Sequence, residues 1–101
     1  MTTPDADPQA DTTLLTRTVT IVNRRGLHAR AAARFVKTVE RFMAEITVVR
    51  KDSTVSGLSI MGLMMLAAGP GATLELRASG EQAQAALDAL VKLVADKFDE
   101  D

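Results

Sequence analysis

Hydrophobic and polar positions in the first part of the chain predict a strand followed by a helix. Residues 18–22 alternate with a period of two, which predicts a strand whose inward side chains are Val19 and Ile21. A turn follows at residues 23–26, and from Ala29 the apolar spacing is that of a helix. The expected buried stripe of this helix comprises Ala32, Phe35, Val36, Val39, Phe42 and Met43.

The middle of the chain predicts a hairpin and a short helix. Alternation returns over residues 45–50, and a turn at residues 51–53 leads to a short strand over residues 54–56. Ser59 is a residue type that caps helices, so we expect a short helix from Ser59 to about Leu66.

The last third of the chain predicts one more strand and a long helix. Residues 72–78 alternate cleanly, with leucines on one face and polar side chains on the other. Ser79 or Gly80 is expected to begin a helix that reaches about Phe98, and Ser79 and Gln82 have the spacing of a capping box. The buried stripe expected for this helix comprises Ala83, Leu87, Leu90, Val94 and Phe98.

These elements predict an α+β fold in the order β-α-β-β-α-β-α. Strands with one apolar face favour an antiparallel sheet that is covered on one side only. Helices on that side make a two-layer, open-faced sandwich. We expect residues 14–101 to form a single domain and the acidic, proline-containing residues 1–13 to form a flexible leader.

The amino-acid composition limits which kinds of catalytic and metal-binding site the chain can form. The 101 residues include no cysteine and one histidine, which excludes disulfides, thiolate zinc sites, a cysteine nucleophile and histidine-rich metal sites. Chemistry near neutral pH must therefore use His28 or carboxylates, and we expect neither a metal nor a cofactor.

The sequence also carries an expectation about location. Residues 1–13 have no basic n-region and no apolar h-region, so they are not a signal peptide. The longest apolar stretch, residues 60–68, is about half of the ~20 residues that a membrane span needs. We expect a cytoplasmic protein that does not insert into a membrane.

Charge is distributed unevenly along the chain. The net charge is −1, but residues 17–51 hold nine basic and two acidic side chains, a net +7. This basic segment contains the only histidine, and it favours an anionic ligand or partner.

His28 lies where the first helix is expected to begin. Backbone amides at a helix start are unpaired and carry partial positive charge, so they can bind a phosphate. Arg30 follows two residues later and can pair with phosphate oxygens. Because imidazole is a nucleophile near neutral pH, these features predict a site that accepts a phosphoryl group and passes it on.

Two simpler interpretations of this helix start remain open. A single histidine there can be a helix cap or a surface residue in a non-catalytic interaction module. A basic helix end can also bind nucleic acid, but base stacking needs exposed aromatic rings. The three aromatic residues, Phe35, Phe42 and Phe98, all lie on predicted core stripes, and we expect no nucleic-acid partner. No spacing places a serine or a carboxylate beside His28, so a hydrolytic triad cannot be argued.

The short helix is rich in methionine. Leu63 and Leu66 fit a core, whereas a helix this short cannot also bury Ile60, Met61 and Met64. We expect these three side chains on the surface, where they can contact partners. A phosphate on Ser59 would add negative charge beside them.

Two motifs together resemble a known family. Residues 26–30 read Gly-Leu-His-Ala-Arg and residues 59–62 read Ser-Ile-Met-Gly, in the matching order of elements. Over residues 17–98 the chain resembles the histidine-containing phosphocarrier (HPr) family of the bacterial phosphoenolpyruvate-dependent phosphotransferase system. The resemblance implies a four-stranded antiparallel sheet under three helices.

The resemblance also implies roles for particular residues. His28 would be phosphorylated on Nδ1 by phospho-enzyme I and would donate to an EIIA-type acceptor, with Arg30 pairing with the phosphate. Ser59 corresponds to a serine that HPr kinase/phosphorylase modifies in some bacteria. The partner surface would comprise Ile60, Met61, Met64, Arg30 and Arg34. We expect a monomeric phosphoryl-transfer intermediate rather than a stand-alone enzyme.

The chain departs from the family pattern at two positions. Ala31 stands where proline is usual, which restores a backbone N–H in the first helical turn. Leu58 stands where lysine is frequent before the serine, which weakens the case for Ser59 as a kinase substrate. Within the family, the alternative function is that of a carrier in the nitrogen-related regulatory branch.

Overall fold

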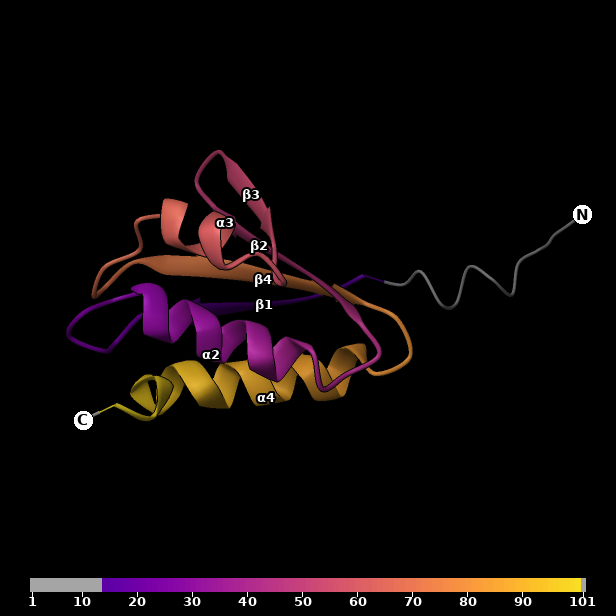
Figure 1. Cartoon of the computed structure of the whole chain (residues 1–101). Coiled ribbons are helices and arrows are strands. Elements are labelled where there is room, and N and C mark those ends of the chain that lie inside the picture. The colour runs from indigo at the N-terminus through magenta and orange to yellow at the C-terminus, as the bar shows by residue number, and fades with distance from the viewer. Residues whose placement is uncertain (1–13, 101) are drawn as a thin grey trace, which may run out of the picture.

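The seven predicted elements are present in the predicted order (Figure 1). The computed structural model describes residues 14–100, so the predicted leader over residues 1–13 lies outside the described residues. The elements are β1 (Leu15–Thr20), α2 (Ala29–Val39), β2 (Glu45–Arg50), β3 (Ser53–Ser56), α3 (Ile60–Met65), β4 (Thr73–Ser79), α4 (Ala83–Ala95) and a short 3₁₀ turn, η1 (Lys97–Asp99).

The strands form one antiparallel sheet in the order β1-β4-β2-β3. Its register aligns the apolar positions, because Val19 pairs with Leu74 and Leu76 pairs with Val48. These side chains are buried, whereas threonines and charged residues alternate with them along the strands. One face is therefore covered and the other is open, as the alternation predicts.

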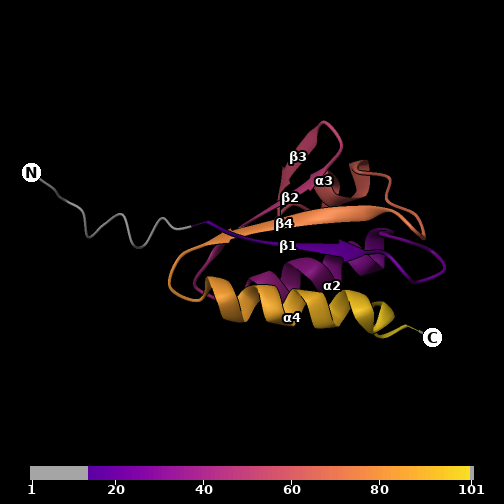
Figure 2. The ribbon, with the colours of Figure 1, turned by 180° about the vertical axis from the view of Figure 1, so that it is seen from behind.

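The helices cover the apolar face of the sheet. Helices α2 and α4 run side by side along it in both views (Figures 1 and 2), and α3 packs against α2 and β3. Phe35 of α2 and Phe98 of η1 are fully buried, together with Leu87 and Leu90 of α4. This layer buries all five residues of the stripe predicted for the last helix.

The limits of the last helix differ from the prediction. Ser79 does not cap it; instead Ser79 is the last residue of β4 and pairs with Glu45 of β2. The chain then turns at Gly80, whose φ is +113°, and α4 begins at Ala83 and ends at Ala95. Phe98 is reached through a separate turn rather than through a continuous helix.

The prediction that Met43 belongs to a buried stripe is wrong. Helix α2 ends at Val39, so the helical register does not continue to Met43, whose side chain is 69% exposed. The Met43 amide instead donates to Oε1 of Gln82, at 2.7 Å. This contact joins the end of α2 to the start of α4 and leaves the methionine side chain in solvent.

The C-terminal turn η1 lies at the same end of the molecule as the turn between β1 and α2 (Figure 1). Segments far apart in the sequence therefore meet where the candidate residue His28 stands. Among residues 14–100, no helix is long and apolar enough to cross a bilayer. The same part of the chain holds no cluster of three side chains that could bind a metal ion.

Candidate functional site

The turn between β1 and α2 is held close to the loop that follows α3. The Leu27 amide donates to the carbonyl oxygen of Ala68 at 2.9 Å, and the Gly26 amide donates to that of Asn23 at 3.2 Å. Gly26 has a φ of +67°, and a Cβ at this position would lie 2.4 Å from the Ala68 oxygen. Glycine is therefore required here for its backbone conformation and for its lack of a side chain.

His28 occupies the N-cap position of α2, but its side chain does not cap the helix. Its backbone is extended (φ −78°, ψ −178°), and no helix amide donates to the imidazole. The first helical hydrogen bond runs from the Ala32 amide to the His28 carbonyl, at 2.8 Å. The three amides before Ala32 have no acceptor within the helix, as at any helix start. The imidazole and these amides are both available for another role.

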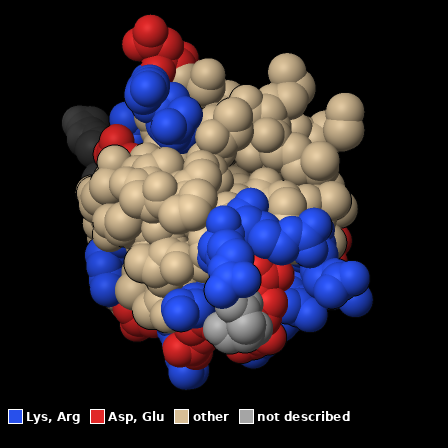
Figure 3. Space-filling view, turned by 90° about the vertical axis from the view of Figure 1, so that its left-hand side faces the viewer, with Lys and Arg blue, Asp and Glu red and all other residues tan. Residues whose placement is uncertain are grey.

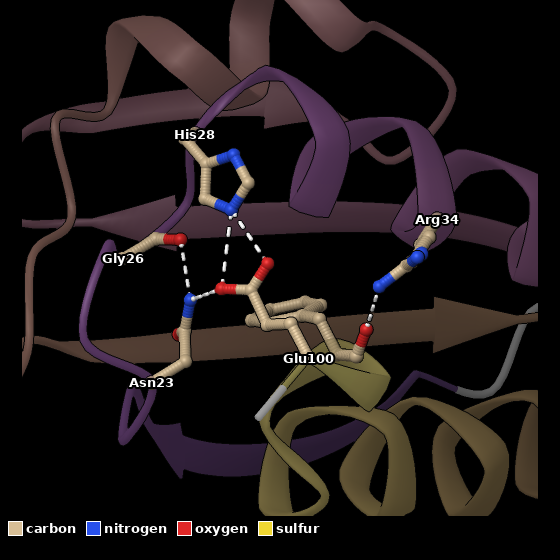
Figure 4. Close-up of polar contacts among 6 residues, drawn as sticks. Asn23, Gly26, His28, Arg34 and Glu100 are labelled. Atoms are coloured by element: carbon tan, nitrogen blue, oxygen red, sulfur yellow. Dashed lines mark hydrogen bonds and ion pairs between the residues drawn. The ribbon is translucent and has the colours of Figure 1, made fainter.

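A carboxylate lies beside the imidazole. Nε2 of His28 is 2.9 Å from Oε1 and 3.2 Å from Oε2 of Glu100 (Figure 4). Both side chains are largely buried, with 15% and 16% exposed. The other ring nitrogen, Nδ1, points away from Glu100 (Figure 4).

Asn23 holds Glu100 in this position. The Asn23 side chain is fully buried, and its Nδ2 donates to Oε2 of Glu100 and to the Gly26 carbonyl, each at 2.8 Å. The hydrogen bond from Asn23 is the main cause that lowers the pKa of Glu100 below its usual value, and contacts with His28 and the charge of Arg25 add to it. These effects outweigh the partial burial, which acts in the opposite direction. The folded protein therefore favours the ionised form of Glu100, which carries a negative charge at neutral pH.

An unusual turn brings Glu100 to the site. Lys97, Phe98 and Asp99 all have positive φ angles (59°, 56° and 62°), so η1 is a left-handed turn built without glycine. A lysine or a phenylalanine costs about 1–2 kcal/mol in this conformation, whereas an aspartate adopts it more readily. Burial of the Phe98 ring opposes this cost, and so does a hydrogen bond that the Arg34 guanidinium donates to the Phe98 carbonyl (Figure 4).

Basic side chains gather on this end of the molecule, next to a broad uncharged surface (Figure 3). Arg24, Arg25 and Arg30 are exposed. Arg30 makes no hydrogen bond with His28 in the described chain, whereas Arg34 is engaged with the C-terminal turn. A shallow hollow of about 180 Å³ opens beside the imidazole and is lined by Arg25, Leu27, His28, Ala67, Ala68 and Gly69.

Helix α3 has the surface that its sequence predicts. Oγ of Ser59 accepts a hydrogen bond from the Gly62 amide at 2.9 Å, and the serine is half-buried. Leu63 and Leu66 are in the core. The exposed apolar side chains on and before this helix are Ile60, Met61 and Met64, together with Leu58 and Met65, which sequence reasoning did not include.

Sequence reasoning also missed Asn23 and Glu100. Glu100 is 72 positions from His28, and the contact depends on the reversal at η1. The sequence places Asn23 only in a turn. Its hydrogen bonds to the Gly26 carbonyl and to Glu100 become visible only in the structure. The available signal for Glu100 was weak: a carboxylate two residues after the last residue of the predicted core stripe.

Comparisons with known proteins agree with this geometry. The sequence model of the family described as "PTS HPr component phosphorylation site" matches residues 15–96. "Phosphocarrier protein HPr" of Pseudomonas aeruginosa is 52% identical over 83 residues, which are 81% of this chain and 92% of that protein. "Phosphocarrier protein NPr" of Shewanella violacea is 49% identical over 88 residues, covering 87% of this chain and 97% of that protein. The crystal structure of HPr-C-His from Thermoanaerobacter tengcongensis superposes with a TM-score of 0.82 at 40% identity, covering 86% of this chain and 98% of that chain.

The fold and these matches define a phosphocarrier, a protein that receives a phosphoryl group and hands it on. The chain belongs to the HPr family of the bacterial phosphotransferase system. Its function is phosphoryl transfer within that system, and its fold is the α+β open-faced sandwich of the family.

Proposed function

We propose that His28 is the residue that carries the phosphoryl group, taking it from phospho-enzyme I and giving it to an EIIA-type acceptor in the cytoplasm. The observation that supports this most is the placement of the only histidine in the chain. Its imidazole stands at the start of α2 without capping the helix, and one ring nitrogen is left without a protein partner among residues 14–100.

The transfer step follows from the ring chemistry. The Nδ1 lone pair of His28 attacks phosphorus, and a P–N bond forms while the bond from phosphorus to the donor atom breaks. The electron pair of the broken bond stays with the donor. The reverse sequence returns the pair to Nδ1 when the acceptor attacks, so the carrier is unchanged after one cycle.

The surroundings of the ring suit a phosphoryl group that must leave again. The free amides of the first turn of α2 can donate hydrogen bonds to its oxygens, and Arg30 is exposed and close in sequence. The helix dipole contributes only ~0.3–1 kcal/mol at an exposed site. Arg25, on the rim of the hollow beside the ring, adds positive charge that favours approach of an anionic partner.

The assignment of His28 is tested by labelling. Incubation with phosphoenolpyruvate and enzyme I is expected to give one phosphate per chain, stable in alkali and labile in acid, as expected for phosphohistidine. His28→Ala should remove all label while the protein stays folded. Label that persists in His28→Ala would place the phosphate on another residue and overturn the assignment.

A second candidate acceptor belongs to the nitrogen-related branch. The identity to the relative named NPr, 49%, is close to that for the relative named HPr, 52%. Adding either a sugar-specific or a nitrogen-branch acceptor to the labelled carrier measures the two transfer rates directly. Faster transfer to the sugar-specific acceptor would support the first proposal, and the opposite order would support the second.

We also propose that the exposed side chains of α3, with Arg30 and Arg34, form the contact surface for these partners. The loop that follows α3 lines the hollow beside His28, so this surface continues to the ring. Phosphorylation of Ser59 would place a double negative charge at the edge of the surface, which makes Ser59 a regulatory site where HPr kinase/phosphorylase is present.

This surface predicts sensitivity to added negative charge. Met61→Glu and Ser59→Asp should each slow transfer from phospho-enzyme I by roughly tenfold, because a charge must be desolvated in the contact. Aspartate is a good N-cap, and Met61 is exposed, so neither change should unfold α3. Met43→Glu is the matched control, because Met43 has the same exposure of 69% and lies beyond the other end of α2. Equal effects of Met61→Glu and Met43→Glu would exclude a specific role for α3.

A further inference from the structure

We propose that Glu100 is a positioning residue for phosphoryl transfer: its carboxylate holds Nε2–H of His28, leaves Nδ1 as the nucleophile and balances the charge of the phosphorylated ring. This inference rests on the proposed role of His28 as the phosphoryl carrier. It concerns a residue outside both motifs that identified the site.

The contact fixes which nitrogen bears the hydrogen. Oε1 and Oε2 of Glu100 lie 2.9 and 3.2 Å from Nε2, so one of the two groups must donate. An ionised carboxylate can only accept hydrogen bonds. Asn23 keeps Glu100 ionised by donating to Oε2, which means that Nε2 carries the hydrogen. In the neutral ring the lone pair is then on Nδ1, the nitrogen that faces away from Glu100.

The same contact compensates a charge that develops during transfer. When Nδ1 of the neutral ring forms its bond to phosphorus, Nε2 keeps its hydrogen and the ring becomes a cation. Glu100 then makes a charge-assisted hydrogen bond to that cation. When the phosphoryl group leaves, the departing ring is a neutral imidazole, a much better leaving group than an imidazolate. No proton needs to be gained or lost in either direction.

The position of Glu100 is built into the fold. The residue follows the left-handed turn η1, which is anchored by the buried ring of Phe98 and by the hydrogen bond from Arg34 to the Phe98 carbonyl. Asn23 ties the carboxylate to the turn that precedes His28. Three left-handed residues without glycine are costly, and such strain persists only where surrounding contacts fix it. Here the fixed conformation places the Glu100 carboxylate beside Nε2 of His28.

Glu100→Gln tests this role, and Asp99→Asn is its control. Glutamine keeps the size and can either accept from or donate to the ring, but it lacks the charge. Asp99→Asn removes the same unit of charge from the same turn at an exposed position, and asparagine tolerates positive φ. Glu100→Asp keeps the charge on a shorter side chain.

Two measurements are made on each variant. Nitrogen NMR of the imidazole in the unphosphorylated protein should show hydrogen on Nε2 alone in the wild type and in Asp99→Asn, and a mixture of tautomers in Glu100→Gln. Transfer from phospho-enzyme I should slow by about three- to tenfold in Glu100→Gln, with a smaller loss in Glu100→Asp and none in Asp99→Asn.

The outcomes separate this inference from the function on which it rests. A wild-type ring with hydrogen on Nδ1, or a Glu100→Gln protein with wild-type tautomer and wild-type rate, would overturn the role of Glu100. Equal slowing by Glu100→Gln and Asp99→Asn would overturn it too, because the effect would then be one of overall charge. Absence of phosphate on wild-type His28 would instead contradict the proposed function, and the NMR result would still report where Glu100 directs the hydrogen.

Discussion

At the scale of single residues, Gly26 controls the position of His28. Its positive φ turns the chain before the histidine, and a Cβ there would lie 2.4 Å from the Ala68 oxygen and 2.8 Å from Cα of Gly69. Both neighbours are backbone atoms, so a side-chain rotation cannot relieve the overlap. Gly26→Ala should therefore lower the free energy of unfolding by more than about 2 kcal/mol, through the left-handed backbone and the overlap together.

Urea denaturation checks this value, and Gly69→Ala is the control. A Cβ at Gly69 meets nothing within 4 Å, and its φ is not positive, so that variant should match the wild type or be slightly more stable. Equal stability of Gly26→Ala and the wild type would mean that the turn can be rebuilt without this contact.

The sequence predicts only those residues of the candidate site that belong to a local pattern. His28 and Arg30 lie two positions apart in one short motif, and the helix that begins there is strongly periodic, so the local pattern was sufficient to find them. Glu100 reaches the ring only because three non-glycine residues adopt positive φ, a conformation that no local pattern predicts. Asn23 becomes informative only when its two acceptors, on different segments, are known.

At the scale of elements, the inward faces of the strands were predicted better than the limits of the elements. The first strand, for example, spans Leu15–Thr20 rather than the predicted residues 18–22. Alternation sets the inward face of each strand, and pairing such as Val19 with Leu74 follows once the apolar faces must coincide. Helix ends depend instead on competition between contacts. Ser79 has the spacing of a cap but extends the β4–β2 ladder, and Gln82 uses its side chain on the Met43 amide. The capping-box prediction failed because ladder and interhelix hydrogen bonds took both residues.

The short helix α3 shows the opposite case, in which local signals agree. Ser59 caps the helix through the Gly62 amide, and Leu63 and Leu66 reach the core. Arg50 of β2 donates to the Leu66 carbonyl at 3.1 Å and so satisfies the end of the helix. Because both ends of α3 are hydrogen-bonded and its leucines are in the core, the helix stays packed on the fold although Met61, Met64 and Met65 are exposed.

At the scale of the whole molecule, the contacts of Glu100 join the two ends of the described chain, because Asn23 and His28 lie near its start and η1 lies at its end. These contacts link stability to pH. The pKa of Glu100 in the folded protein is lowered from the usual 4.5, so the folded state favours the ionised form. A lowered pKa contributes stability that is present above the unfolded value and lost as pH falls through the folded value.

Glu100→Gln cannot titrate at this position, so the difference in free energy of unfolding between wild type and this variant isolates the effect. The difference should shrink as the pH falls from about 5 towards 3, because the unfolded chain takes up a proton on Glu100 before the folded protein does. Urea denaturation of both proteins across this range measures it, and other carboxylates cancel because both proteins contain them. A difference that stayed constant down to about pH 3 would mean that the carboxylate gains nothing from Asn23 and His28 on folding. A shrinking difference would show that closing the C-terminal turn onto Asn23 and His28 is part of the global folding equilibrium.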